Sequence, residues 1–251
     1  HQAFNFAYLE TKWEAAKLRD VVDESLREFG AVGAPSTWVL SNHDVIRHVT
    51  RLSYTELPKQ GDGIGPDYPQ PDEARGQRVG RAASAFMLGL PGSSYLYQGE
   101  ELGLPEHTTL EAKYRQDPTF FRTKGERVGR DGCRVPIPWE ADAPTFGFSE
   151  TGKSWLPQPE NYRSYSRDQQ MGVAGSTLEL YKRLLEVRKG FGLGDGELEW
   201  VDALCTESTL AYKNRSVMVV ANLGRDALAL PEGEVLVATQ PELNASGVLG
   251  R

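Results

Sequence analysis

The amino-acid sequence predicts an α/β fold in which parallel strands alternate with helices, followed by a small antiparallel sheet. Three segments with strand character are each followed by a segment with helical periodicity. That order is typical of parallel strands joined by crossover helices. From about residue 196, short strand-like segments separated by turn residues replace it, which indicates an antiparallel module. We therefore expect two domains, residues 1–195 and residues 196–251.

Composition excludes several classes of partner. The chain has 251 residues, of which 39% are hydrophobic, and a net charge of −7, as in a soluble globular protein. It lacks the clustered Lys and Arg that nucleic acid requires and any apolar run of the roughly 18–20 residues that a membrane helix needs. We therefore expect neither a nucleic-acid nor a membrane partner. The two cysteines have no metal-ligand spacing and fit a reducing compartment. We expect no metal, no cofactor and, without a signal peptide, a cytoplasmic location.

The first strand and helix are predicted near the N-terminus. Residues 4–8 alternate apolar and polar side chains, which predicts a short strand. Thr11 and Glu14 have the spacing of a capping box, and apolar residues then recur every three or four positions. This pattern predicts a helix that ends at Gly30.

Two further strands and one helix follow. Residues 38–40 are an apolar strand that ends in the polar run 41–44, and the next segment, to Pro71, is rich in Gly and Pro and predicts a loop. Helical periodicity extends over residues 72–90, and residues 94–97 predict the third strand.

The remaining chain divides into an irregular stretch, a helix and short strands. Residues 104–170 lack long periodic segments, and such a stretch in a compact domain is usually functional. Ser176 and Glu179 form a second capping box before a helix that ends at Gly190. The expected strands of the antiparallel module are residues 198–201, 209–212, 216–221 and 235–237.

The strongest candidate for chemistry is the polar run after the second strand. Asn42, His43 and Asp44 lie at the carboxyl end of that strand, where parallel α/β proteins place their active sites. A carboxylate beside an imidazole, with Arg47 and Arg51 nearby, can bind sugar hydroxyls and face a developing positive charge. The alternative is that Asp44 only caps the next helix and His43 is a hydrogen-bonded turn residue.

Three motifs resemble one family. The Asn–His–Asp run with its two following arginines resembles the last conserved stretch of glycoside hydrolase family 13, the α-amylase family. Residues 94–103 are similar to the strand-eight segment of the α-glucosidase and oligo-1,6-glucosidase branch. Residues 130–139, with 147–148 and 153–156, resemble the loop that marks that branch. Because the three motifs occur in the family's order at compatible spacings, the resemblance is specific.

The resemblance implies a fold and roles for three residues. Residues 1–195 would be the C-terminal part of a (β/α)8 barrel, strands six to eight with a long loop after strand eight, and residues 196–251 a β-sandwich domain. Asp44 would be the family's third carboxylate, which stabilises the transition state. His43 and Arg134 would bind the sugar beside the cleaved bond of an α-glucoside oligosaccharide. The alternative role of Arg134 is an ion pair within its own loop, and Arg47 and Arg51 are interpreted as supports.

The chain departs from the family in its carboxylates. A retaining glycosidase needs a nucleophile and a separate acid/base about 5–5.5 Å apart. The family's nucleophile lies in a G-x-R-x-D stretch and its acid/base in another Glu-bearing stretch, and this sequence contains neither. Glu100 and Glu101 are adjacent on a segment expected to be extended, so they would point to opposite faces and cannot flank one bond.

The sequence thus predicts part of a retaining α-glucosidase that is inactive as an isolated chain. The first alternative is a non-catalytic module that binds carbohydrate or associates with proteins, through self-association or pairing with the N-terminal half of the barrel. A three-stranded part of a barrel would leave a strand edge open for such pairing. Within the family, transglucosylases, isomerases and trehalose-forming enzymes are also alternatives.

Overall fold

The computed structural model describes residues 3–240 and 248–249, which form two compact units. The first, here called the strand unit, comprises His1–Leu40, Ala82–Tyr95 and Leu180–Arg251. The second, here called the loop unit, comprises Ser41–Arg81 and Leu96–Glu179. These units do not test the proposed domain boundary at residues 195–196, which stays a prediction. None of the described helices is long and apolar enough to cross a membrane.

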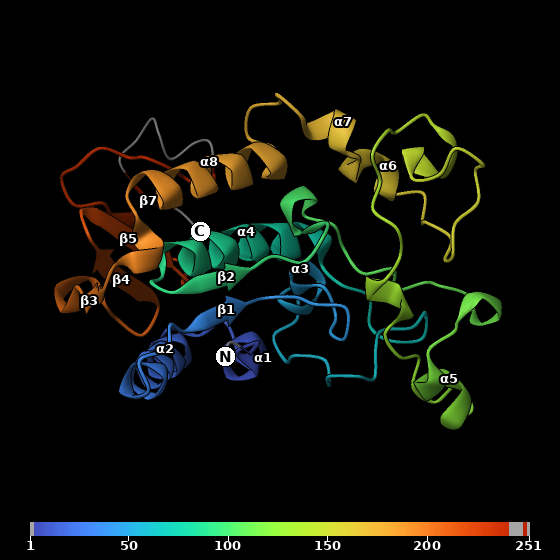
Figure 1. The fold of residues 1–251 in the computed structure, drawn as a ribbon, viewed down its shortest axis with the longest axis horizontal. Coiled ribbons are helices and arrows are strands. Elements are labelled where there is room, and N and C mark those ends of the chain that lie inside the picture. The colour runs from blue at the N-terminus through green and yellow to red at the C-terminus, as the bar shows by residue number, and fades with distance from the viewer. Residues whose placement is uncertain (1–2, 241–247, 250–251) are drawn as a thin grey trace. The chain divides into compact units, whose positions relative to one another are not determined.

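The strand unit contains a parallel pair of strands (Figure 1). β1 (Thr37–Val39) lies beside β2 (Ser93–Tyr95), with Trp38 opposite Ser94. All residues of β1 are buried, and the Trp38 indole Nε1 donates to the Pro91 carbonyl oxygen over 2.6 Å. The prediction of two successive parallel strands is confirmed. The chain between them includes α4 (Glu73–Gly89), which confirms the helix expected over residues 72–90.

The strand expected over residues 4–8 is wrong. Asn5 instead begins the helix α1 (Phe6–Glu10), because its side-chain oxygen accepts a hydrogen bond from the Tyr8 amide at 2.9 Å. Such an N-cap competes with a strand for the same backbone. One bond towards β1 remains, from the Asn5 amide to the Thr37 carbonyl oxygen over 3.2 Å.

The next helix forms as expected, but its predicted cap does not. α2 (Ala15–Ala31) buries an apolar face that includes Leu18 and Val22 and continues one residue past Gly30. Its N-cap residue is Glu14, which makes no side-chain cap bond. Thr11 instead donates its hydroxyl to the Ala7 carbonyl oxygen, so the capping box is absent at this helix. Burial of the apolar face is therefore the interaction that fixes α2.

The helix predicted after the second capping box is confirmed as α8 (Thr177–Gly190). Here the box is made at least in one direction, since the Ser176 hydroxyl accepts from the Glu179 amide at 3.2 Å. The C-terminal parts of α8 and α4 lie side by side in Figure 1, and the hydroxyls of Ser84 and Tyr181 are hydrogen-bonded at 2.6 Å between them.

The C-terminal segment is antiparallel, as predicted. β3 (Leu198–Trp200), β4 (Thr209–Asn214) and β5 (Val217–Asn222) form one sheet in that order, and β6 (Leu228–Ala229) pairs with β7 (Val248–Leu249). The strand expected over residues 235–237 is wrong. The Leu236 carbonyl oxygen accepts from the Arg183 guanidinium, and the Leu236 side chain packs against the cluster of Val187, Leu193 and Val217. The β-sandwich stays a prediction.

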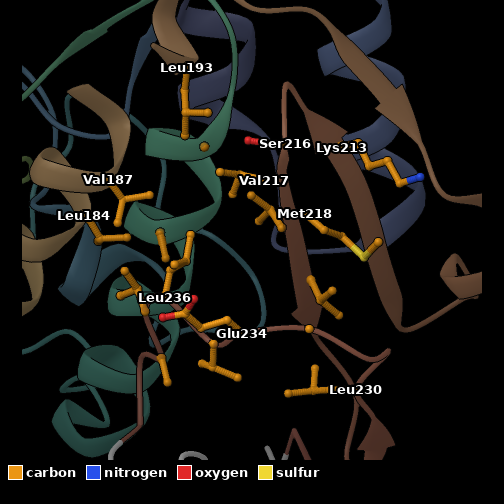
Figure 2. Close-up of a pocket in the computed structure, with 18 of the residues that line it drawn as sticks. Leu184, Val187, Leu193, Lys213, Ser216, Val217, Met218, Leu230, Glu234 and Leu236 are labelled. Carbon is orange, nitrogen blue, oxygen red and sulfur yellow. The ribbon is translucent and has the colours of Figure 1, made fainter. Parts of the chain in front are cut away.

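An open, largely apolar pocket of about 570 Å³ lies within the strand unit (Figure 2). Its lining comes from α4, α8, β5 and the chain over residues 230–239. Leu184 and Val187 of α8, with Val217 of β5 and Leu236, line it in Figure 2.

The loop unit contains short helices around an apolar cluster. Its elements are α3 (His48–Arg51), η1 (Glu100–Leu102), η2 (Ala112–Tyr114), α5 (Pro118–Arg122), η3 (Asp131–Cys133), η4 (Pro144–Gly147), α6 (Tyr162–Tyr165) and α7 (Arg167–Gln170). The extended conformation expected at Glu100 and Glu101 is wrong, because both residues lie in η1. The cluster includes Leu104, Val135 and Tyr162, each at most 1% exposed. It fixes the irregular stretch predicted over residues 104–170.

Arg188 fixes the end of α4 within the strand unit. It lies in the last turn of α8 and donates through Nη1 to the carbonyl oxygens of Leu88 (2.6 Å) and Leu90 (2.7 Å). Its Nη2 donates to the Gly92 carbonyl oxygen at 2.5 Å. Carbonyl groups at a helix C-terminus lack intrahelical donors, and the Arg188 guanidinium supplies the missing hydrogen bonds.

We predict that Arg188→Met lowers the free energy of unfolding by about 2–4 kcal/mol, because three carbonyl groups lose a charged donor. The matched control is Lys189→Met, which removes the adjacent exposed cation and is expected to change stability by less than about 0.5 kcal/mol. Urea unfolding followed by circular dichroism measures both. Equal effects of the two substitutions would contradict the role given to Arg188.

Candidate functional site

The polar run after β1 forms a tight turn. The Asp44 amide donates to the Asn42 side-chain oxygen at 2.8 Å, a local bond that Asn commonly makes in turns. The N-cap residue of the following helix, α3, is Arg47. The alternative that Asp44 caps this helix is therefore wrong, and its carboxylate is available for other contacts.

Two arginines hold the Asp44 carboxylate. Its Oδ1 accepts from Arg130 Nη1 at 2.7 Å and from Arg134 Nη2 at 3.0 Å. Its Oδ2 lies 3.4 Å from His43 Nε2. The structure thus brings the predicted site residues His43, Asp44 and Arg134 together and adds Arg130. The Asp44 side chain remains 44% exposed and the His43 side chain 64%, so a ligand can reach both.

Arg134 makes its hydrogen bonds across to the turn. Besides the contact with Asp44, its Nε donates to the His43 carbonyl oxygen at 2.8 Å. Arg134 follows η3, in the loop after β2, so one side chain fixes the main chain of the turn and its carboxylate together. These bonds differ from the ion pair within its own loop that was the alternative interpretation.

Arg130 is the site residue that the sequence reasoning missed. It lies at the start of the recognised 130–139 motif, but its partner Asp117 lies outside that motif. Arg130 Nε donates to Asp117 Oδ2 at 2.6 Å, and the Asp117 side chain is fully buried. Burial raises the pKa of Asp117, but hydrogen bonds from Arg130 and from the Thr119 amide outweigh this effect and hold the pKa below its usual range. Asp117 is therefore an ionised buried carboxylate.

Arg47 is buried next to the site, in agreement with the supporting role predicted for it. It is 1% exposed, its Nη1 donates to the Gln98 carbonyl oxygen at 2.8 Å, and its guanidinium carbon lies 4.9 Å from the centre of the Tyr97 ring. The Tyr97 hydroxyl in turn donates to the Cys133 carbonyl oxygen at 3.0 Å. Arg51 is also 1% exposed, consistent with a supporting role.

Glu106 joins the turn to the arginine-bearing loop. Its Oε2 accepts from the Arg47 amide at 3.0 Å. It also packs against Gly132, where an added Cβ would lie 2.6 Å from Oε1. The neighbouring His107 amide donates to the Gly132 carbonyl oxygen at 3.1 Å. The segment 106–107 therefore contacts both chain segments that contribute to the site.

Burial shifts the protonation of several groups beneath the site. It raises the pKa of Glu106 to about 7, although the Arg47 amide and the charges of Arg47 and Arg115 act in the opposite direction. It raises the pKa of Glu100 to about 8. For the imidazole of His48, burial together with the nearby Arg51 and Arg47 lowers the pKa to about 3.

The arrangement offers one reachable carboxylate with fixed cations around it. Such a group accepts hydrogen bonds from hydroxyls and stabilises a positive charge that develops nearby. Within the described part of the chain, no group of three or more His, Cys, Asp or Glu side chains is placed to hold a metal ion. Both cysteines are free. The buried Cys133 thiol donates to the Arg130 carbonyl oxygen at 3.1 Å, and burial raises its pKa.

Comparisons with known proteins give a consistent result. The model of the alpha-amylase catalytic domain matches residues 2–193. A probable alpha-glucosidase of Rhizobium meliloti is 32% identical over 214 residues, which cover 82% of this chain and 35% of the relative. An oligo-1,6-glucosidase of Parageobacillus thermoglucosidasius is 26% identical over 232 residues, which cover 84% of this chain and 38% of the relative.

Solved structures agree with this result. The alpha-glucosyl transfer enzyme XgtA is similar with a TM-score of 0.70 and 31% identity, over 92% of this chain and 40% of that enzyme. The trehalose-6-phosphate hydrolase of Bacillus licheniformis has a TM-score of 0.73 and 22% identity, over 98% of this chain and 48% of that enzyme. At that identity the second match concerns the fold alone. The chain spans between a third and a half of the length of these relatives.

We predict that Glu106 makes stability depend on pH. Glu106 titrates near pH 4.5 when unfolded and near pH 7 when folded, so between these values only the folded chain keeps the proton. Raising the pH through this range therefore removes roughly 2–4 kcal/mol of stability. Glu106→Gln keeps the shape without the charge, and its stability should not show this loss.

The measurement is the free energy of unfolding of the natural chain and of Glu106→Gln at pH 5, 6, 7 and 8. Glu100 and His48 titrate in both proteins, so their contributions cancel in the difference. The exposed Glu150→Gln is the matched control and should follow the natural chain at every pH. A difference that stays constant with pH would show that Glu106 has an ordinary pKa.

Proposed function

The chain belongs to the α-amylase family of glycoside hydrolases, and we propose that it is part of an α-glucosidase that hydrolyses α-glucosidic bonds of oligosaccharides with retained configuration. The observation that carries the proposal is the half-exposed Asp44, whose Oδ1 is held by Arg130 and Arg134 beside His43. A rigid charge of this kind suits a sugar whose ring carbon becomes positively charged.

Each residue has a distinct part in this proposal. Asp44 faces the oxocarbenium-like transition state, where its negative charge is stabilising because it is already oriented. His43 Nε2 and Asp44 Oδ2 bind hydroxyls of the sugar beside the cleaved bond. Arg134 binds the same sugar and keeps the turn in place through the His43 carbonyl oxygen.

The nucleophile and the acid/base would come from sequence outside this chain. Retention requires two carboxylates about 5–5.5 Å apart and a covalent glycosyl-enzyme intermediate. The family's stretches that carry these groups do not occur in the 251 residues. Among similar structures are an alpha-glucosyl transfer enzyme and a trehalulose synthase. Transglucosylation and isomerisation are therefore alternatives, which differ in whether water or a sugar hydroxyl attacks the intermediate.

The second candidate function is association with another barrel segment or another copy of the chain. The small parallel sheet of the strand unit favours this function. Among the described residues the sheet has only two strands, β1 and β2, although all residues of β1 are buried as in the interior of a larger sheet. Strands of a parallel sheet are normally covered and paired on both sides. A non-catalytic module of this type could also bind a sugar weakly through the same turn and arginines.

We predict that the isolated chain does not cleave a chromogenic α-glucoside such as p-nitrophenyl α-glucoside. The reason is that one carboxylate cannot supply a nucleophile and an acid/base together. Release of nitrophenol is followed by absorbance, with the Parageobacillus oligo-1,6-glucosidase as positive control. Turnover that disappears in Asp44→Asn would contradict the prediction and show that these residues suffice for hydrolysis.

We predict that the chain self-associates through β2. Light scattering should give a mass above 27.8 kDa at micromolar concentration, falling on dilution. Tyr95 of β2 is 42% exposed, and Tyr95→Lys should favour the monomer because a charged edge side chain opposes strand pairing. Trp155→Lys, at a 71% exposed position of the loop unit, is the matched control. A monomer that resists concentration would contradict this prediction.

A further inference from the structure

Two aspartates join the segment before α5 to the segment that carries the site arginines. Asp131 Oδ2 accepts from the amides of Gln116 (2.8 Å) and Asp117 (2.9 Å). In the other direction, Asp117 Oδ2 accepts from the Arg130 amide at 2.9 Å. Each carboxylate thus binds the main chain of the other segment, and the pair fixes the two segments against each other.

The backbone geometry around Asp117 is equally restricted. Gly129 has a φ of +76°, and a Cβ there would lie 2.8 Å from the Asp117 Cβ and Cγ atoms. Only glycine therefore permits this approach. Asp117 Oδ1 also accepts from the Thr119 amide at 2.8 Å, so both carboxylate oxygens are engaged. Asp117 cannot turn away without losing several bonds.

The guanidinium of Arg130 is shared between a buried and an exposed carboxylate. Nε donates to Asp117 Oδ2 at 2.6 Å and Nη2 to Asp117 Oδ1 at 3.4 Å, while Nη1 donates to Asp44 Oδ1 at 2.7 Å. The Asp117 side chain is 0% exposed and that of Asp44 44%. Water and salt weaken exposed ion pairs more than buried ones, so the Asp117 end is the firmer attachment.

We propose that Asp117 is a positioning residue for the candidate site, because it fixes one edge of the Arg130 guanidinium. Arg130 Nη1 then holds Asp44 Oδ1, and Asp44 Oδ2 faces the ligand. Asp117 touches no ligand itself. What Asp44 then does with a sugar rests on the proposed function, whereas the placement of Arg130 does not. The depressed pKa of Asp117 agrees with a carboxylate that stays charged in this position.

Loss of Asp117 and loss of Asp44 should affect the Arg130 guanidinium differently, which nuclear magnetic resonance can test. The Arg130 Nε–Hε group exchanges its proton with water slowly while it is bonded to Asp117. We expect Asp117→Asn to accelerate this exchange roughly tenfold, because the guanidinium loses the negative charge of its acceptor. Asp44→Asn should leave it within about twofold, because Asp44 binds the other end of the guanidinium.

Two further variants serve as controls. Asp142→Asn removes an exposed carboxylate that pairs with Arg163, and it should leave the Arg130 signal unchanged. Arg130→Lys keeps the charge but has no Nε, and its effect on the Asp44 side-chain carboxyl signal should match that of Asp117→Asn. Loss of protection in Asp44→Asn, or unchanged protection in Asp117→Asn, overturns the proposal. If Asp117→Asn fails to fold, Asp44→Asn alone still tests the proposal, because faster exchange of Arg130 Nε–Hε in that variant would show that Asp44 protects this end of the guanidinium.

A titration with methyl α-glucoside tests the proposed function separately. Binding should move the His43 and Arg134 side-chain signals in the natural chain. If the Arg130 result holds while the sugar moves neither signal, the proposed sugar site fails and the positioning role of Asp117 stands. If the sugar moves both signals but Arg130 exchanges equally fast in the natural chain and in Asp117→Asn, the positioning role fails alone.

Discussion

The candidate site depends on the requirement of buried carboxylates for hydrogen-bond donors. Glu106 and Asp117 are both removed from water, and each obtains a donor from the main chain of a site segment, the Arg47 amide and the Arg130 amide respectively. A buried acidic group that lost such a donor would cost several kcal/mol. The turn after β1 and the arginine-bearing loop are therefore held where these acids need them.

The two acids differ in charge for a reason that the geometry explains. Asp117 accepts from the Arg130 guanidinium directly, so its carboxylate stays ionised although it is buried. Glu106 receives a neutral amide, and burial dominates, which raises its pKa to about 7. One acid thus provides a fixed charge that orients an arginine. The other provides a contact whose strength depends on pH.

The sequence predicted those elements whose patterns are long or whose motifs are specific. The helices over residues 72–90 and after Ser176 have several turns of periodic apolar residues, and both formed. The alternation over residues 4–8 is too short to outweigh one Asn side chain that caps a helix. Leu236 and Val237 pack against a buried apolar cluster without forming strand pairs, so tertiary contacts override their preference for a strand.

The same distinction applies to the site. His43, Asp44 and Arg134 lie in recognisable motifs, and the structure brings them within hydrogen-bond range of one another. No sequence pattern singles out Asp117, because an aspartate before a proline is common in loops. Its burial depends on Gly129 and on folding of the whole loop. The residues proposed to bind a sugar can be recognised from motifs, whereas the residue proposed to position them is recognised only from the fold.

The contacts that orient the Asp44 carboxylate lie within one of the two units. His43, Asp44, Arg130, Arg134 and Asp117 all belong to the loop unit, and every hydrogen bond described among them is made inside that unit. The orientation of Asp44 therefore does not require the strands that would carry a nucleophile and an acid/base. Electrostatic stabilisation is strongest where charges are oriented before the reaction begins. If Asp44 has the role proposed for it, the contacts described within the loop unit already orient its carboxylate for that role.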